Sequence, residues 1–231
     1  MIQEVTKICG IPAILWGSAS SKVYLYLHGK GGNKEEAALF SSVVCPLGWQ
    51  VLSIDLPEHG ERRRESNAFD PWHCVKELSL VLAYVKSRWK QVALYANSIG
   101  AWFSLLSFAK EQFENCLFVS PILDMKALIE TMMRWANVSE ERLEKEKRIP
   151  TQFGETLSWD YWTYVLRHPI TAWPSDTKIL YAGQDHLVSR GIVEQFVRRF
   201  HCDLCVMETG EHWFHTEEQL DFLRQWLLDN L

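Results

Sequence analysis

Short apolar runs alternate with longer amphipathic stretches along most of this 231-residue chain. Runs such as KVYLYL at 22–27 and QVALYA at 91–96 have the length and the β-branched and aromatic content of buried strands. The stretch from 71 to about 89 is long enough for a helix, and Asp70 and Pro71 stand where an N-cap and a first helical residue are favoured. This alternation predicts an α/β fold, a mostly parallel central sheet flanked by helices.

The same pattern predicts the remaining elements of the core. Segments 2–8 and 12–16 flank Cys9 and Gly10 and are expected to form an antiparallel hairpin. Further strands are expected at 50–55, 116–119, 177–182 and 203–207. Further helices are expected from Asn33, from 99 to about 110, near 188–200 and from about Thr216.

The periodicity breaks down between residues 123 and 173. This segment is too long for a simple connection and too patterned for disorder, so we interpret it as a helical cap insertion. The α/β core then comprises residues 1–122 and 174–231. The charge run at 140–148 is expected to be the solvated face of a helix.

A strand turns directly into a helix at the segment YANSIG, residues 95–100. Such a junction leaves its central residue, here Ser98, on a sharp turn where the strand and helix backbones approach closely. The sequence supplies the small residues Ala96 and Gly100 on either side. The start of the helix also favours developing negative charge through its free N–H groups. Ser98 is therefore the candidate nucleophile.

This segment resembles the nucleophile elbow G-x-S-x-G of the α/β-hydrolase superfamily, with Ala96 in place of the first glycine. A second segment, HGKGG at 28–32, resembles the HG-x-G turn from which members of that superfamily donate a backbone N–H to the oxyanion. The resemblance implies an α/β-hydrolase fold. It also implies an oxyanion hole formed by the backbone N–H groups of Lys30 and Ile99.

The segment YAGQDH at 181–186 follows a predicted strand and resembles the superfamily's acid turn, G-x-x-D, with one residue instead of two between Gly183 and Asp185. The resemblance implies that Asp185 is the carboxylate that accepts the Nδ1 proton of the catalytic histidine. Asp124, just after an earlier strand, is the alternative acid, because some members of the superfamily place theirs there.

The segment GEHWFH at 210–215 lies between the last predicted strand and the last helix. It resembles the superfamily's G-x-H turn and implies that His212 is the general base. His215, beside the start of the helix, is the alternative. Two histidines three residues apart also suggest a metal site, but no third ligand of matching spacing accompanies them, so no metal is expected.

The resemblance implies a serine hydrolase that works through a Ser98–His212–Asp185 triad and an acyl-enzyme. We expect a carboxylesterase acting on a small or medium carboxylic ester, with neither metal nor organic cofactor. A thioesterase is the nearest enzymatic alternative, so the expected partner is a small-molecule ester or thioester. From a different class, the chain could be a non-catalytic ligand-binding protein of the same fold.

Aromatic residues are the candidates for a substrate pocket, because the chain has 11 tryptophans and bulky aromatics line many apolar sites. The alternative is that they only pack the insertion and the core. The pocket candidates are Trp102, Trp135, Trp159, Trp162 and Trp213.

Charge and cysteine content limit the other classes of protein to which the chain could belong. The formal net charge of −5, with no basic stripe, argues against a nucleic-acid partner. No uncharged apolar run approaches the length of a membrane span, and the N-terminus lacks the features of a signal peptide. The six cysteines are scattered through mostly apolar contexts, which is typical of reduced thiols. We therefore expect a cytoplasmic protein.

Overall fold

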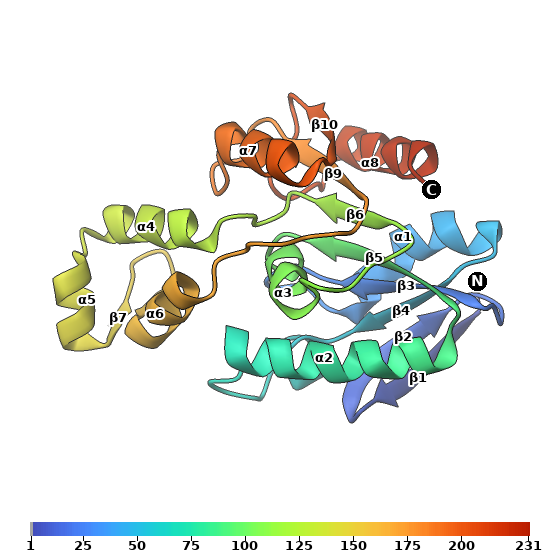
Figure 1. Ribbon diagram of the computed structural model, residues 1–231, viewed down its shortest axis with the longest axis horizontal. Coiled ribbons are helices and arrows are strands. Elements are labelled where there is room, and N and C mark those ends of the chain that lie inside the picture. The colour runs from blue at the N-terminus through green and yellow to red at the C-terminus, as the bar shows by residue number, and fades with distance from the viewer. Residues whose placement is uncertain (1) are drawn as a thin grey trace. The chain divides into compact units, whose positions relative to one another are not determined.

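A computed structural model describes residues 2–231 of the chain. Its centre is an eight-stranded sheet of order β1-β2-β4-β3-β5-β6-β9-β10 (Figure 1). The six strands from β4 to β10 in that order are parallel, and β2 is antiparallel to both of its neighbours. The predicted, mostly parallel sheet is thus confirmed. Its strands are β1 (Gln3–Ile8), β2 (Ile11–Trp16), β3 (Lys22–Leu27), β4 (Gln50–Ile54), β5 (Gln91–Asn97), β6 (Cys116–Val119), β9 (Thr177–Ala182) and β10 (Asp203–Met207).

Helices cover both faces of this sheet (Figure 1). Helices α1 and α8 contact each other on one face, and α2 and α3 contact each other on the other. On the first face, a buried apolar cluster includes Tyr26, Tyr95 and Leu180 of the sheet together with Phe40 and Leu227 of the helices. The helices of this unit are α1 (Ala37–Val44), α2 (Pro71–Arg88), α3 (Ile99–Ser107), α7 (Arg190–Phe200) and α8 (Glu217–Asp229).

The opening hairpin is confirmed. Strands β1 and β2 pair from Gln3 opposite Trp16 to Ile8 opposite Ile11, which leaves a two-residue turn. Both turn residues have positive φ, 52° at Cys9 and 85° at Gly10. Two successive positive φ values are what a tight hairpin turn requires, and glycine supplies the second at little cost.

Two predicted helix starts are wrong by a few residues. Asn33 does not begin an α-helix, because it caps a short 3-10 turn, Lys34–Glu36, and accepts the N–H of Glu35 at 3.0 Å. The helix near 188 begins only at Arg190. The N–H of Val188 donates to the Asp185 carboxylate at 3.1 Å, which keeps the preceding residues in a loop. Helix α3 also ends at Ser107, short of the expected residue 110. Other 3-10 turns are Cys45–Leu47 and Gly60–Arg62.

Residues 124–171 form a second compact unit, and residues 1–123 with 172–231 form the first. The second unit has a small core of its own, in which Leu143, Ile149, Leu157 and Trp162 are buried. Helix α5 is otherwise exposed, so the charge run is a solvated helix face over residues 140–146 as predicted. The pairing of β7 with β8 was not predicted, because three-residue strands are too short to show a periodicity. The elements are α4 (Met125–Ala136), α5 (Glu140–Glu146), β7 (Arg148–Pro150), β8 (Thr156–Ser158) and α6 (Trp159–Arg167).

Among residues 2–231, no helix combines the length and the apolar character that crossing a membrane requires.

Candidate active site

Ser98 occupies the junction between β5 and α3. Its backbone conformation, with φ 50° and ψ −120°, is one that residues other than glycine rarely adopt. Such strain persists only where the surroundings fix it, and it gathers at functional sites. Here hydrogen bonds hold the peptide on both sides. The N–H of Ser98 donates to the carbonyl of Val119 at 3.1 Å, and its own carbonyl accepts the N–H of Ile122 at 3.0 Å. The sharp turn predicted at Ser98 is therefore present.

Gly100 permits the close approach of α3 to β3. A Cβ at this position would lie 2.7 Å from the carbonyl oxygen of His28 and 2.8 Å from that of Leu27. Both oxygens belong to backbone, which cannot move aside as a flexible side chain can. Glycine at position 100 is therefore a steric requirement of the junction.

Replacing Gly100 by alanine should accordingly destabilise the fold by roughly 1–3 kcal/mol, the usual cost of overpacking a well-filled region. Gly191 in α7 offers a matched control, because nothing lies within 4 Å of a Cβ there. Gly191→Ala should leave stability unchanged or raise it by up to about 1 kcal/mol. Denaturant unfolding of both variants checks this. Equal stabilities for the two variants would contradict the steric account.

Ser98, His212 and Asp185 form one continuous chain of hydrogen bonds. The Oγ of Ser98 lies 2.8 Å from Nε2 of His212, and Nδ1 of His212 lies 2.6 Å from Oδ2 of Asp185. The carboxylate of Asp185 is fully buried. Its other oxygen accepts the N–H groups of Leu187 and Val188, at 2.7 and 3.1 Å. A carboxylate that accepts the Nδ1 proton leaves Nε2 free to accept the hydroxyl proton of Ser98.

The alternative acid and base have other roles. Asp124 accepts the N–H of Ala127 at 3.0 Å and caps the start of α4. The ring of His215 stacks on Trp213, with centroids 4.8 Å apart, and its Nδ1 lies 2.7 Å from the Trp213 carbonyl oxygen. The structure thus brings together Ser98, Asp185 and His212, the three residues favoured from the sequence.

The turn after β3 lies against the serine. A Cβ built on Gly29 would lie only 3.2 Å from the Cβ of Ser98, so the two backbones are in close contact. Lys30 is the next residue of this turn. Ile99 is the first residue of α3, where a backbone N–H has no partner within the helix. Both predicted oxyanion donors therefore belong to segments that adjoin Ser98.

His28 fixes the conformation of this turn. The ring is fully buried, with Nδ1 2.7 Å from the carbonyl oxygen of Gly29. Its Nε2 accepts the N–H of Leu56 at 3.0 Å. Burial is the main cause that lowers the pKa of His28 from 6.5 to about 4; His59 and Lys34 also lower it, whereas the hydrogen bond to Gly29 and the charge of Asp55 partly oppose the shift. His28 is therefore a neutral ring at pH 7 that donates through Nδ1 and accepts through Nε2.

This arrangement predicts a pH dependence of stability. Below pH 6.5 the unfolded chain protonates His28, whereas the folded protein does so only near pH 4. The stability that neutral His28 contributes is thus complete above pH 6.5 and is lost as the pH falls from 6.5 to 4. Between pH 7.5 and 5, wild type should lose about 2 kcal/mol more unfolding free energy than His28→Gln. Denaturant titrations at both pH values check this, and equal losses would contradict it.

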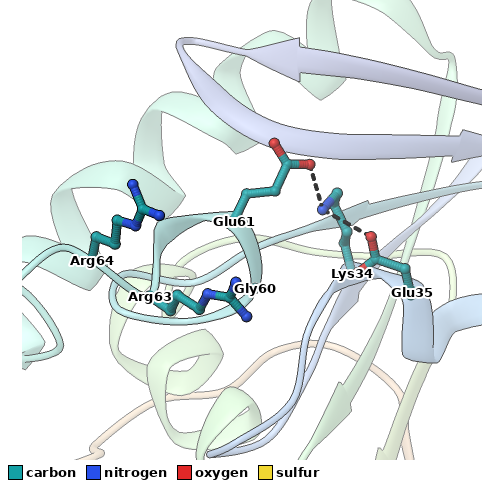
Figure 2. A pocket seen from close by; sticks show the side chains of 6 residues that line it. All are labelled: Lys34, Glu35, Gly60, Glu61, Arg63 and Arg64. Carbon is teal, nitrogen blue, oxygen red and sulfur yellow. Dashed lines mark ion pairs between the residues drawn. The ribbon is translucent and has the colours of Figure 1, made fainter.

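Lys34 ties the loop after β4 to the start of α1. Its side chain is buried, yet its Nζ lies 2.9 Å from Asp55, 2.8 Å from Glu61 and 3.0 Å from Glu35. Burial disfavours the ammonium, but hydrogen bonds to Glu61, Asp55 and Glu35 outweigh it and raise the pKa of Lys34. Figure 2 shows Glu61 and Glu35 directed at Lys34. They line a pocket of about 490 Å³ with Lys34, Gly60, Arg63 and Arg64.

Two residues beside Ser98 were not identified from the sequence. Ser120 follows β6 as Ser98 follows β5; it is fully buried, with φ 43°, and its Oγ has no hydrogen-bond partner among residues 2–231. The strand end at Ser120-Pro121 was evident, but not the strained conformation. Asn97 is the last residue of β5 and lies next to the Gly29 turn. Its position before the serine was the only available signal.

The candidate pocket tryptophans occupy different environments. Trp102 and Trp162 are buried, whereas Trp213, next to His212, is 71% exposed. Within residues 124–171, Trp135 lines a pocket of about 500 Å³ and packs edge-on against Phe153. Trp159 lies under the Nζ of Lys147 at 5.4 Å. A role for these five in substrate binding remains a prediction.

No group of three or more histidine, cysteine, aspartate or glutamate side chains within residues 2–231 is arranged to hold a metal ion.

The sequence and the structure were compared with those of known proteins. No protein-family model and no curated protein matches the sequence. Among solved structures, Est1E from Butyrivibrio proteoclasticus matches with a TM-score of 0.77 at 14% identity, covering 98% of this chain and 96% of that one. Alpha/beta hydrolase domain-containing protein 10 from mouse matches at 0.76 and 11% identity, covering 99% and 98%. The thioesterase domain from the curacin biosynthetic pathway matches at 0.61 and 16% identity, covering 99% of each chain.

The chain therefore has the α/β-hydrolase fold, as its resemblance to that superfamily implied. Est1E has also been solved with ferulic acid bound, and that structure matches with a TM-score of 0.75.

Proposed function

We propose that this protein is a serine hydrolase, a carboxylesterase that cleaves a small or medium carboxylic ester. The observation that carries the proposal is the hydrogen-bonded series Asp185–His212–Ser98, which ends at a serine held on a strained elbow. Chance juxtaposition of an acid, a base and a hydroxyl in this order would not also require the backbone strain at the hydroxyl-bearing residue. Strain of that kind is typical of reacting residues.

The proposed mechanism uses the groups that these hydrogen bonds align. Nε2 of His212 accepts the Ser98 proton as Oγ attacks the acyl carbon, and the carbonyl electron pair moves onto the oxygen. The N–H groups of Lys30 and Ile99 donate to that oxyanion. His212 then gives its proton to the leaving alcohol, which departs and leaves an acyl-enzyme. Water, activated by the same His212, releases the acid and restores Ser98. Asp185 stabilises the charged imidazolium throughout.

A thioesterase is the second candidate, and the likeness to the curacin thioesterase domain over 99% of both chains favours it. The same triad serves both reactions, because a thiolate needs less protonation than an alkoxide to leave. The location we propose is the cytoplasm. In support, all six cysteines are free thiols, which is typical of proteins kept in reducing compartments.

Turnover of a matched panel of substrates tests the proposal. The panel pairs oxygen esters with thioesters of the same acyl groups over a range of chain lengths, and adds a ferulate ester because Est1E binds ferulic acid. We expect hydrolysis of at least one short or medium ester, and the ratio of kcat/KM for ester and thioester identifies the preferred bond. A folded protein that hydrolyses no member would contradict the enzymatic proposal and leave the ligand-binding alternative.

A further inference from the structure

Asn97 lies beside the reacting groups, and its side chain has no hydrogen-bond partner among residues 2–231. It immediately precedes Ser98, and a Cβ built on Gly29 would lie 3.8 Å from its Cγ and 3.2 Å from the Ser98 Cβ. The Asn97 side chain and Ser98 therefore both adjoin the turn that carries Lys30. Strand alternation agrees with this placement, because Asn97 shares a face with Tyr95, whose ring packs on Phe40 of α1 with centroids 4.5 Å apart. The Gly29 turn leads into that same helix.

Asn97 is a half-buried residue, and its carboxamide makes no hydrogen bond to any residue between 2 and 231. Comparable amides of the core are engaged. The Nδ2 of Asn115 donates to the Tyr24 hydroxyl at 3.1 Å and to the Asn230 carbonyl at 2.9 Å, and Gln50 accepts the Trp89 indole N–H at 2.8 Å. A polar group held partly away from water without a partner costs free energy. Such a group next to a nucleophile is placed for a partner that arrives with the substrate.

We propose that the Asn97 carboxamide is a third hydrogen-bond donor to the carbonyl oxygen of the acyl group, beside the N–H groups of Lys30 and Ile99. This inference rests on the proposed hydrolase function. When Ser98 attacks, the new C–O bond forms and the carbonyl electron pair moves onto oxygen, while the serine proton goes to His212. The Nδ2–H of Asn97 keeps its proton and donates a hydrogen bond that strengthens as the oxygen becomes negative.

The substitutions Asn97→Ala and Asn97→Asp separate donation from packing. Alanine removes both the shape and the donor, whereas aspartate keeps the shape but offers only acceptor oxygens when ionised. A donor role predicts that kcat falls about 100-fold in Asn97→Ala and at least as far in Asn97→Asp, with KM nearly unchanged. A packing role predicts the opposite order, with aspartate close to wild type. The measurement is kcat and KM at pH 8, on the best substrate of the panel.

Asn33→Asp is the matched control. Like Asn97→Asp, it adds one negative charge, and it does so at the end of the turn that contains Gly29 and Lys30. Its side chain accepts the Glu35 N–H, which aspartate can also do, so wild-type activity is expected. Denaturant midpoints of all variants should match wild type. If Asn97→Asp retains the wild-type kcat, or if both Asn97 variants change only KM, the third-donor inference is wrong. Failure of the underlying function looks different, since wild type itself would then hydrolyse no substrate of the panel.

Discussion

Replacing Ser98 by alanine should lower kcat by three or more orders of magnitude while the protein stays folded. The hydroxyl lies 2.8 Å from Nε2 of His212, so its loss removes both the attacking atom and the group that this base would activate. Residual activity then comes from the oxyanion donors and from binding alone. The measurement is kcat on the best substrate of the panel, with denaturant unfolding to verify the fold.

Ser120→Ala is the control for this prediction. Ser120 follows Val119, which pairs with Asn97 in the sheet register; it is fully buried and also has positive φ, but its Oγ has no partner among the described residues. Removing a buried hydroxyl without a partner is close to neutral for stability. Activity should therefore survive in Ser120→Ala and vanish in Ser98→Ala. The reverse result would contradict the assignment of Ser98 and would make Ser120, at the end of β6, the nucleophile.

The substitution Asp185→Asn should lower kcat by about 10³- to 10⁴-fold with little change in KM. An amide in this position can donate to Nδ1 of His212, which favours the tautomer that carries its proton on Nε2. That tautomer cannot accept the proton of Ser98. The 2.6 Å contact between Nδ1 and the Asp185 carboxylate is the physical basis of the expected effect.

Asp124→Asn controls for the alternative acid. Asparagine caps helices as well as aspartate does, so the bond to the Ala127 N–H at the start of α4 should persist. We expect activity and stability near wild type. A large loss of kcat in Asp124→Asn, with Asp185→Asn unaffected, would show that the acid comes from the end of β6.

Much of the fold could be predicted from the sequence because its signals are local. The Cys9-Gly10 turn between two short strand-like segments indicated the hairpin, and the Asp70 N-cap with Pro71 marked the start of α2. In the structure, Asp70 accepts the His73 N–H at 2.9 Å, as a capping residue should. The elbow at Ser98 could also be predicted, because the segment itself contains the strand, the turn and the small residues that the close approach of the strand and helix backbones requires.

The features that were not predicted depend on contacts between distant residues. Lys34 follows a glycine-rich turn, and the charged segment that contains it is typical of a solvated helix start. It is buried because Asp55, 21 residues away, accepts both its Nζ and its backbone N–H. The strain at Ser120 and the unpartnered amide of Asn97 likewise arise only when β3, β5, β6 and β9 lie side by side. No local pattern in the sequence predicts such an arrangement.

Covalent labelling of the wild-type protein by a fluorophosphonate tests the central claim most directly. Such a probe phosphonylates a serine only when a base activates the hydroxyl and an oxyanion hole receives the phosphoryl oxygen. Intact-mass and peptide mass spectrometry should find one adduct, on Ser98, and none on the Ser98→Ala variant. A folded wild-type protein that takes up no probe, or takes it up at another residue, would contradict the assignment of Ser98 as the activated nucleophile.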